Sequence, residues 1–250
     1  TQEEYSSMEI SDRRAEGQPE AIIRRAEQLA QPERAHSLLP FSIKDSTREY
    51  SKDLAVWCVL SIVLLLSPTL VRDRLRRTRA MQWTSRRGRS ILTTQMAAAV
   101  CSALMLTIIN LVIYAVPFLA QEPLQFRACG LGGIWAWGSP WFDWTYGTYL
   151  VVLVVLILVL SLAAAGLTVF LSQYSGNYIA MLLKALPLFV AIGAALGSWL
   201  LDQPFTFRRF WTDGPWMPRG TEAVVAAGLL LVSFLLCALT CLRQRKRELL

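Results

Sequence analysis

The chain has 250 residues, of which 54% are hydrophobic and 17% charged, and a formal net charge of +7 at neutral pH. Its mean hydropathy is +0.40, and 9 tryptophans add to an apolar content above that of a soluble domain of this length. These values exclude an ordinary soluble globular protein and indicate an integral membrane protein.

Residues 1–53 form a polar segment with eight Lys or Arg against eleven Asp or Glu. Within it, the stretch from Pro19 to Arg34 has proline at a helix start and apolar residues on one face. The apolar residues are Ile22, Ile23, Ala26, Leu29 and Ala30. The spacing predicts a short amphipathic helix. We expect it to pack on neighbouring loops, and contact with a substrate or partner is the alternative.

Five apolar runs follow, each with about 18 residues or more and few charges, as is typical of membrane-spanning helices. At 1.5 Å per residue, each can cross about 30 Å of hydrocarbon. The runs extend over residues 54–71, 91–119, 149–171, 180–201 and 223–242. They predict an all-α fold, a polytopic transmembrane helical bundle over residues 54–242. Bends are expected at Pro68, Pro117 and Pro187.

Positive charge is concentrated in two segments beside these runs. Residues 72–90 hold eight Arg against Asp73, and the tail 243–250 holds four Lys or Arg against Glu248. Short loops rich in Lys and Arg stay in the cytoplasm. We therefore expect both segments inside, and residues 1–53, 121–147 and 202–222 outside. This is the topology of a multi-pass protein of a cell membrane, and we expect the bacterial cytoplasmic membrane.

The expected outer position of residues 1–53 raises a question of insertion, because a long polar segment does not cross a membrane unaided. No apolar core of a signal peptide precedes Leu54. We therefore expect a further span upstream of Thr1, which would give six spans in the intact protein with both ends cytoplasmic. A translocated tail is the alternative.

The sequence offers no set of residues for catalysis or for a metal. His36 is the one histidine, the five cysteines have no CxxC spacing, and Lys184 is the one ionisable residue inside a predicted span. Lys184 lies near the expected cytoplasmic end, where its long stem can reach the headgroups. We therefore predict a chain that is not an enzyme and carries no cofactor. Nucleic acid is not an expected partner, because the excess positive charge lies directly beside helices.

The arginine-rich segment 72–90 carries more charge than orientation of a span requires. It also contains Leu75, Met81 and Trp83, a mixture that suits a short helix at the membrane surface offering a face to a protein. Contact with membrane lipids alone is the alternative.

The stretch SPTLVRDRLRRTRAMQWTSRRGRSILTTQMAAAV resembles a region of type 2 ABC transporter permeases. There a span ends, a charged stretch follows, and a threonine or serine, a basic pair and Gly-Arg lead into the next helix. The chain departs from the family at Arg72–Asp73 and at Gln95, where an acidic residue and a lysine are common. The chain also resembles this family in the arrangement of its spans, in its sizeable outer segment and in a short polar inner turn from Ser172 to Tyr178.

The resemblance implies the permease subunit of an ATP-driven exporter for an amphipathic or apolar substrate, such as a lipid, peptide or drug. Two copies, or this chain with a related one, would form a dimer that binds ABC ATP-binding subunits, and ATP and Mg would bind to those partners. The coupling loop that contacts them would comprise Arg76, Arg77, Arg79, Trp83, Thr84, Ser85, Arg86, Arg87, Gly88 and Arg89.

Aromatic residues crowd both expected outer loops, 133–149 and 203–218. In the family that the chain resembles, the last outer loop often dips into the membrane and closes the exit. This implies an outer gate of Phe205, Phe207, Phe210 and Trp211. A plain aromatic belt at the headgroups is the alternative.

Two other classes of function stay open. One is a non-transporting accessory or sensor protein with residues 1–53 as its detector, and the other is a membrane-embedded enzyme with its catalytic residues upstream.

Overall fold

The computed structural model describes residues 10–29, 39–75, 91–131, 140–209 and 214–248. Over these residues the protein consists of helices joined by turns and loops, without a β-strand. The predicted all-α fold is therefore confirmed. Among the described helices, five are long and apolar enough to cross a membrane, so the protein is a polytopic helical membrane protein.

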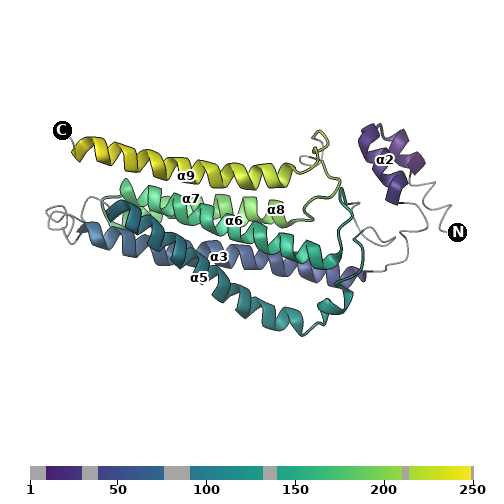
Figure 1. Ribbon diagram of the computed structural model, residues 1–250, viewed down its shortest axis with the longest axis horizontal. Coiled ribbons are helices and arrows are strands. Elements are labelled where there is room, and N and C mark those ends of the chain that lie inside the picture. Colours follow the sequence, from purple (N-terminus) through teal and green to yellow (C-terminus); the bar gives the residue numbers. More distant parts are fainter. Residues whose placement is uncertain (1–9, 30–38, 76–90, 132–139, 210–213, 249–250) are drawn as a thin grey trace.

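The spanning helices lie side by side along the long axis of the molecule (Figure 1). They are α3 (Phe41–Leu75), α5 (Ile91–Leu119), α6 (Tyr146–Gln173), the fourth span made of α7 (Tyr178–Phe189), η4 (Val190–Gly197) and α8 (Ser198–Leu201), and α9 (Thr221–Glu248). A short helix, α2 (Glu20–Leu29), stands apart at one end, within the segment whose spacing predicts an amphipathic helix.

The first spanning helix begins at Phe41, well before the predicted start at residue 54. Its first turns are polar, so the apolar run marks only the later part. Lys52 and Arg48 on these turns lie 2.9 and 3.8 Å from the carboxylate of Asp202, which follows α8. The helix therefore extends because its polar beginning has ionic partners at the end of the bundle.

The fourth span is continuous but changes its helix type. Pro187 lies inside α7, and residues Val190–Gly197 have the wider π-helical hydrogen-bonding pattern. Gly193 and Gly197 face α3 here, and a Cβ atom on them would lie 3.4 Å from the Cβ of Val59 and 3.7 Å from that of Ala55. The glycines thus allow the widened segment to lie close to α3.

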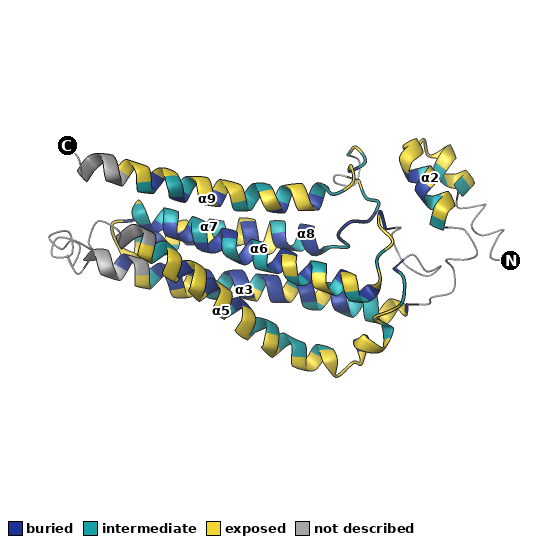
Figure 2. Ribbon diagram, viewed as in Figure 1, coloured by how far each residue is buried: buried dark blue, intermediate teal, exposed yellow. Residues whose placement is uncertain are grey.

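The core of the bundle lies between α3 and α6. Half of the most apolar stretch of α3 and 44% of that of α6 are buried inside the protein, against 17% for α5. Buried residues such as Val59 and Cys58 of α3 belong to one hydrophobic cluster with Leu156 and Leu160 of α6. Figure 2 shows the exposed outward faces of α5 and α9. These faces carry large apolar residues, as lipid-facing surfaces do.

Helix α9 packs on α6 through a close contact at Gly166. The Ser233 hydroxyl donates to the carbonyl oxygen of Ala163 at 3.1 Å, and the Cys237 thiol donates to that of Gly166 at 3.2 Å. A Cβ atom on Gly166 would lie only 2.1 Å from Ser233 Oγ. Small residues that let helix backbones approach are the usual means of helix association in lipid.

The two ends of the bundle separate the segments that the charge pattern assigns to opposite sides. The C-terminal ends of α3, α6 and α9 lie at one end, and α2 with the outer loops lies at the other (Figure 1). At the first end, the Lys184 ammonium donates to the carbonyl oxygen of Tyr174 at 2.8 Å. This contact places a positive charge at the C-terminus of α6, where the helix dipole favours it.

Candidate functional site

The coupling loop expected from the sequence lies outside the described residues. This applies to all ten of its residues, Arg76, Arg77, Arg79, Trp83, Thr84, Ser85, Arg86, Arg87, Gly88 and Arg89. Of the expected gate residues, Phe210 and Trp211 also lie outside the described residues, whereas Phe205 and Phe207 are described. The candidate site that can be built from the structure is therefore at the end of the bundle that the charge pattern assigns to the outside, which we call the outer end.

Five aromatic side chains from two loops meet there, and we call them the outer aromatic cluster. The ring of Phe142 stacks on that of Trp144 with centroids 4.9 Å apart. Phe205 presents its ring at a steep angle to both, at 6.0 and 5.0 Å. Trp141 meets Phe207 edge to face at 4.4 Å. Such geometries are favourable beyond the area that they bury.

Backbone contacts also join the two loops. The N–H of Trp141 donates to the carbonyl oxygen of Phe205 at 2.9 Å, and Pro140 and Thr206 form an isolated antiparallel bridge. The first loop is itself tied to the start of α6, because the N–H of Tyr146 donates to the carbonyl oxygen of Cys129 at 2.8 Å. The aromatic residues are thus positioned by backbone as well as by ring packing.

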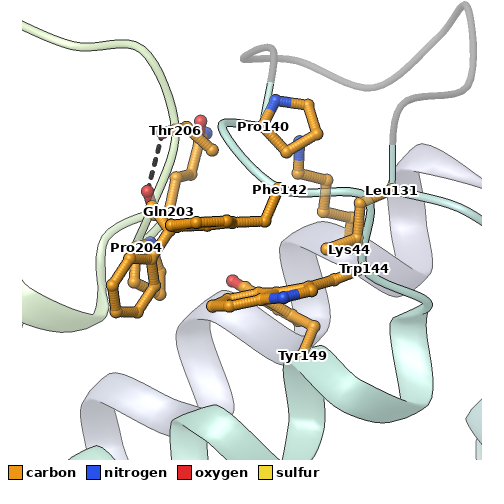
Figure 3. A pocket seen from close by; sticks show the side chains of 10 residues that line it. Lys44, Leu131, Pro140, Phe142, Trp144, Tyr149, Gln203, Pro204 and Thr206 are labelled. Atoms are coloured by element: carbon orange, nitrogen blue, oxygen red, sulfur yellow. Dashed lines mark hydrogen bonds between the residues drawn. The ribbon is translucent and has the colours of Figure 1, made fainter. Parts of the chain in front are cut away.

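A small cavity lies within the cluster. Figure 3 shows the parallel rings of Phe142 and Trp144, with Tyr149 of α6 below them. The cavity is lined by Lys44, Leu131, Pro140, Phe142, Trp144, Tyr149, Gln203, Pro204, Phe205 and Thr206. Its volume of about 10 Å³ is the space of one water. In this conformation the cavity within the cluster therefore has room for nothing larger than a water molecule.

The turn that carries Phe205 has an unfavourable backbone conformation. Gln203 and Phe205 have φ angles of 52° and 61°, the left-handed region that glycine adopts freely and bulky residues rarely adopt. Each such residue costs about 1–3 kcal/mol unless its surroundings hold it. Phe205 is nonetheless 7% exposed and packed into the cluster.

A buried ion pair holds this turn. Glu222, in the first turn of α9, accepts from the N–H of Phe205 at 3.2 Å and from Arg208 Nη2 at 2.9 Å. The other terminal nitrogen of Arg208, Nη1, donates to the carbonyl oxygens of Trp199 and Asp202 at 2.9 and 2.7 Å. The side chains of Arg208 and Glu222 are only 17% and 3% exposed. The fourth span, the outer loop and α9 are therefore joined at one point.

Helix α2 docks on the other loop of the cluster. Arg25, which is 6% exposed, lies 2.6 Å from the carboxylate of Asp143 and donates through Nε to the carbonyl oxygen of Pro140 at 3.3 Å. Ile22, one of the apolar residues predicted to face a neighbouring surface, is buried beside it. The amphipathic helix thus packs on a neighbouring loop.

The sequence reasoning missed the charged residues that hold this end together. It counted Arg25, Asp143, Arg208 and Glu222 only toward the charge of each side. For Glu222 the sequence did contain one signal of a structural role. It is an acidic residue immediately before the apolar run 223–242, at the start of the predicted helix, where the helix dipole favours a negative charge. Nothing in the sequence indicates that Arg25 and Asp143 meet, because they lie 118 residues apart.

Within the described part of the chain, no group of three or more His, Cys, Asp or Glu could hold a metal ion. Comparison of the chain with protein-family models, with curated proteins and with solved structures found no match.

Proposed function

We propose that this chain is the permease subunit of an ATP-driven ABC exporter in the bacterial cytoplasmic membrane. In this proposal the arginine-rich segment 72–90 binds ATP-hydrolysing partners in the cytoplasm, and an amphipathic or apolar substrate leaves at the outer aromatic cluster. The proposal includes a cytoplasmic C-terminus.

The observation that carries the proposal is the packed aromatic cluster at the end of the bundle opposite the end where α3 stops and α5 begins. Helix α3 leads into that segment and α5 leads out of it, and both run the length of the bundle. A displacement of α3 and α5 at their inner ends can therefore be transmitted along the helices to the cluster. Phe205 and Phe207, expected in the outer gate, both belong to the cluster, which supports a gating role.

The packing inside one chain supports a dimer. Apolar side chains fill the space between α3 and α6, and buried hydroxyls such as those of Ser67, Thr107 and Thr168 donate to carbonyl oxygens of their own helices. The described core therefore offers no polar path through a single chain. A substrate path between two subunits is consistent with this packing.

The test is affinity purification of the full-length protein from its native membrane in mild detergent, followed by mass spectrometry of what stays bound. Arg86, Arg87 and Arg89 are changed together to Ser. The matched control changes Arg243, Arg245 and Arg247 to Ser, which removes the same charge from the same expected side. We expect an ATPase with Walker motifs to remain bound to the wild type and the control and to be lost from the loop variant. No ATPase in any of the three purifications would contradict the exporter.

The second candidate is a sensor or accessory protein, and the docking of α2 favours it. A helix held by a buried arginine on an outer loop can report a bound molecule to that loop. In the same purification, a signalling protein in place of the ATPase would support this reading.

A further inference from the structure

We propose that Glu222 is a latch that holds the strained 203–205 turn, and with it the outer aromatic cluster, in the closed conformation. Release of the latch lets the turn relax and opens the cavity. This inference rests on the proposed exporter only for what the opening is used for, namely substrate exit. The opening itself requires no ATP and no partner.

The first step is that the closed turn has a conformation which its own residues disfavour. Two residues with side chains, Gln203 and Phe205, have left-handed φ angles of 52° and 61° within three positions. Residues in this region persist only where the surroundings over-determine them, and they cluster at switch regions and clamps. The turn should therefore relax to another conformation when the contacts that hold it are lost.

The second step is that the restraint depends on one carboxylate. Glu222 Oε1 accepts both from the N–H of Phe205, at 3.2 Å, and from Arg208, at 2.9 Å. Arg208 in turn donates to the carbonyl oxygen of Asp202, directly before the turn, and to that of Trp199 in α8. Loss of the charge of Glu222 would weaken the hold on both sides of the strained residues, because bonds to a charged group are the stronger ones.

The third step is that the turn forms part of the cavity wall, so that a change in the turn changes the cavity. Phe205 forms one wall of the cavity, and its carbonyl oxygen accepts from the N–H of Trp141 on the opposite loop. Leu131 also lines the cavity and is 7% exposed. A turn that relaxes removes Phe205 from the wall and exposes Leu131 to water.

The experiment measures how fast a cysteine at residue 131 reacts with a membrane-impermeant maleimide on intact cells. The parent is the full chain with Cys129→Ser and Leu131→Cys, since Cys129 is the native thiol of the outer loop. Glu222→Gln is expected to raise the labelling rate about tenfold through a larger open population. Glu20→Gln is the matched control, because Glu20 is in an exposed ion pair of α2, and it should leave the rate unchanged.

Added to Glu222→Gln, Gln203→Gly should restore slow labelling, because glycine adopts the left-handed conformation without strain. Gln203→Ala should not restore it, although it removes the same side chain. The latch is overturned if Glu222→Gln labels as slowly as the parent, or if the glycine and alanine variants behave alike. Should Glu222→Gln fail to fold, as judged by size-exclusion profile, Arg208→Lys replaces it. Arg208→Lys keeps the positive charge opposite Glu222 but loses contacts to the carbonyl oxygens of Trp199 and Asp202. It should label faster than the parent, and labelling as slow as that of the parent would overturn the proposal.

Discussion

At the scale of the residue, the outer end depends on charged side chains that are buried rather than displayed. Arg25 is 6% exposed and Glu222 2%, and each has a partner of opposite charge from another part of the chain. Removal of the partner of Arg25 or of Glu222 is costly, because the buried residue then keeps its charge away from water without compensation. The same charges spread over an exposed surface would contribute little.

Arg25→Met should therefore release α2 while the bundle stays folded. The methionine keeps an apolar stem but loses the contacts to Asp143 and to the carbonyl oxygen of Pro140, a loss of about 1–3 kcal/mol. The measurement is amide hydrogen exchange of α2 in the full-length protein, which should become faster. Arg14→Met is the control, because Arg14 pairs with Glu27 in an exposed position and should cost less than about 1 kcal/mol. Equal exchange in the two variants would contradict the docking role of Arg25.

At the scale of the element, apolar runs identify the spans but not their full extent or their neighbours. The runs ending at residues 119 and 201 agree with the ends of α5 and α8, because hydropathy changes abruptly there. The start of α3 was missed, since Phe41 to Asp53 is polar and its helix depends on partners such as Asp202. The π-helical part of the fourth span was missed as well, because helix type depends on packing against α3.

The contact between α6 and α9 makes a prediction at this scale. Gly166→Ala would put a Cβ atom 2.1 Å from Ser233 Oγ, and such overpacking costs about 1–3 kcal/mol. We expect a lower melting temperature in detergent. Adding Ser233→Ala should recover most of the loss, because the clashing oxygen is then absent. Gly228→Ala serves as control, since nothing lies within 4 Å of its Cβ position, and it should not lower the melting temperature. Failure of the double variant to recover would show that Gly166 does not act through Ser233.

At the scale of the whole molecule, composition and charge predict a helical membrane protein, and the fold confirms it. Through its resemblance to the permease family, the sequence also implied an outer gate that includes Phe205 and Phe207. It could not predict that Trp141, Phe142 and Trp144 would join them, because that contact depends on how two loops 60 or so residues apart fold over the bundle. The pairs Arg25–Asp143 and Arg208–Glu222 depend on the same tertiary arrangement.

The proposed orientation, with the arginine-rich segment in the cytoplasm and the outer aromatic cluster outside, is tested most directly by cysteine labelling on intact cells. Two forms of the full chain, each with one introduced cysteine, are compared in a Cys129→Ser background, Glu20→Cys in α2 and Gly176→Cys in the turn after α6. The Cys129→Ser chain without an introduced cysteine gives the labelling of the four remaining native cysteines. Both positions are exposed, and a Cβ atom at Gly176 meets nothing within 4 Å. A membrane-impermeant maleimide should label the residue 20 form at once and the residue 176 form only after the cells are opened. Immediate labelling of residue 176 with protection of residue 20 would contradict the predicted orientation and, with it, the cytoplasmic coupling loop.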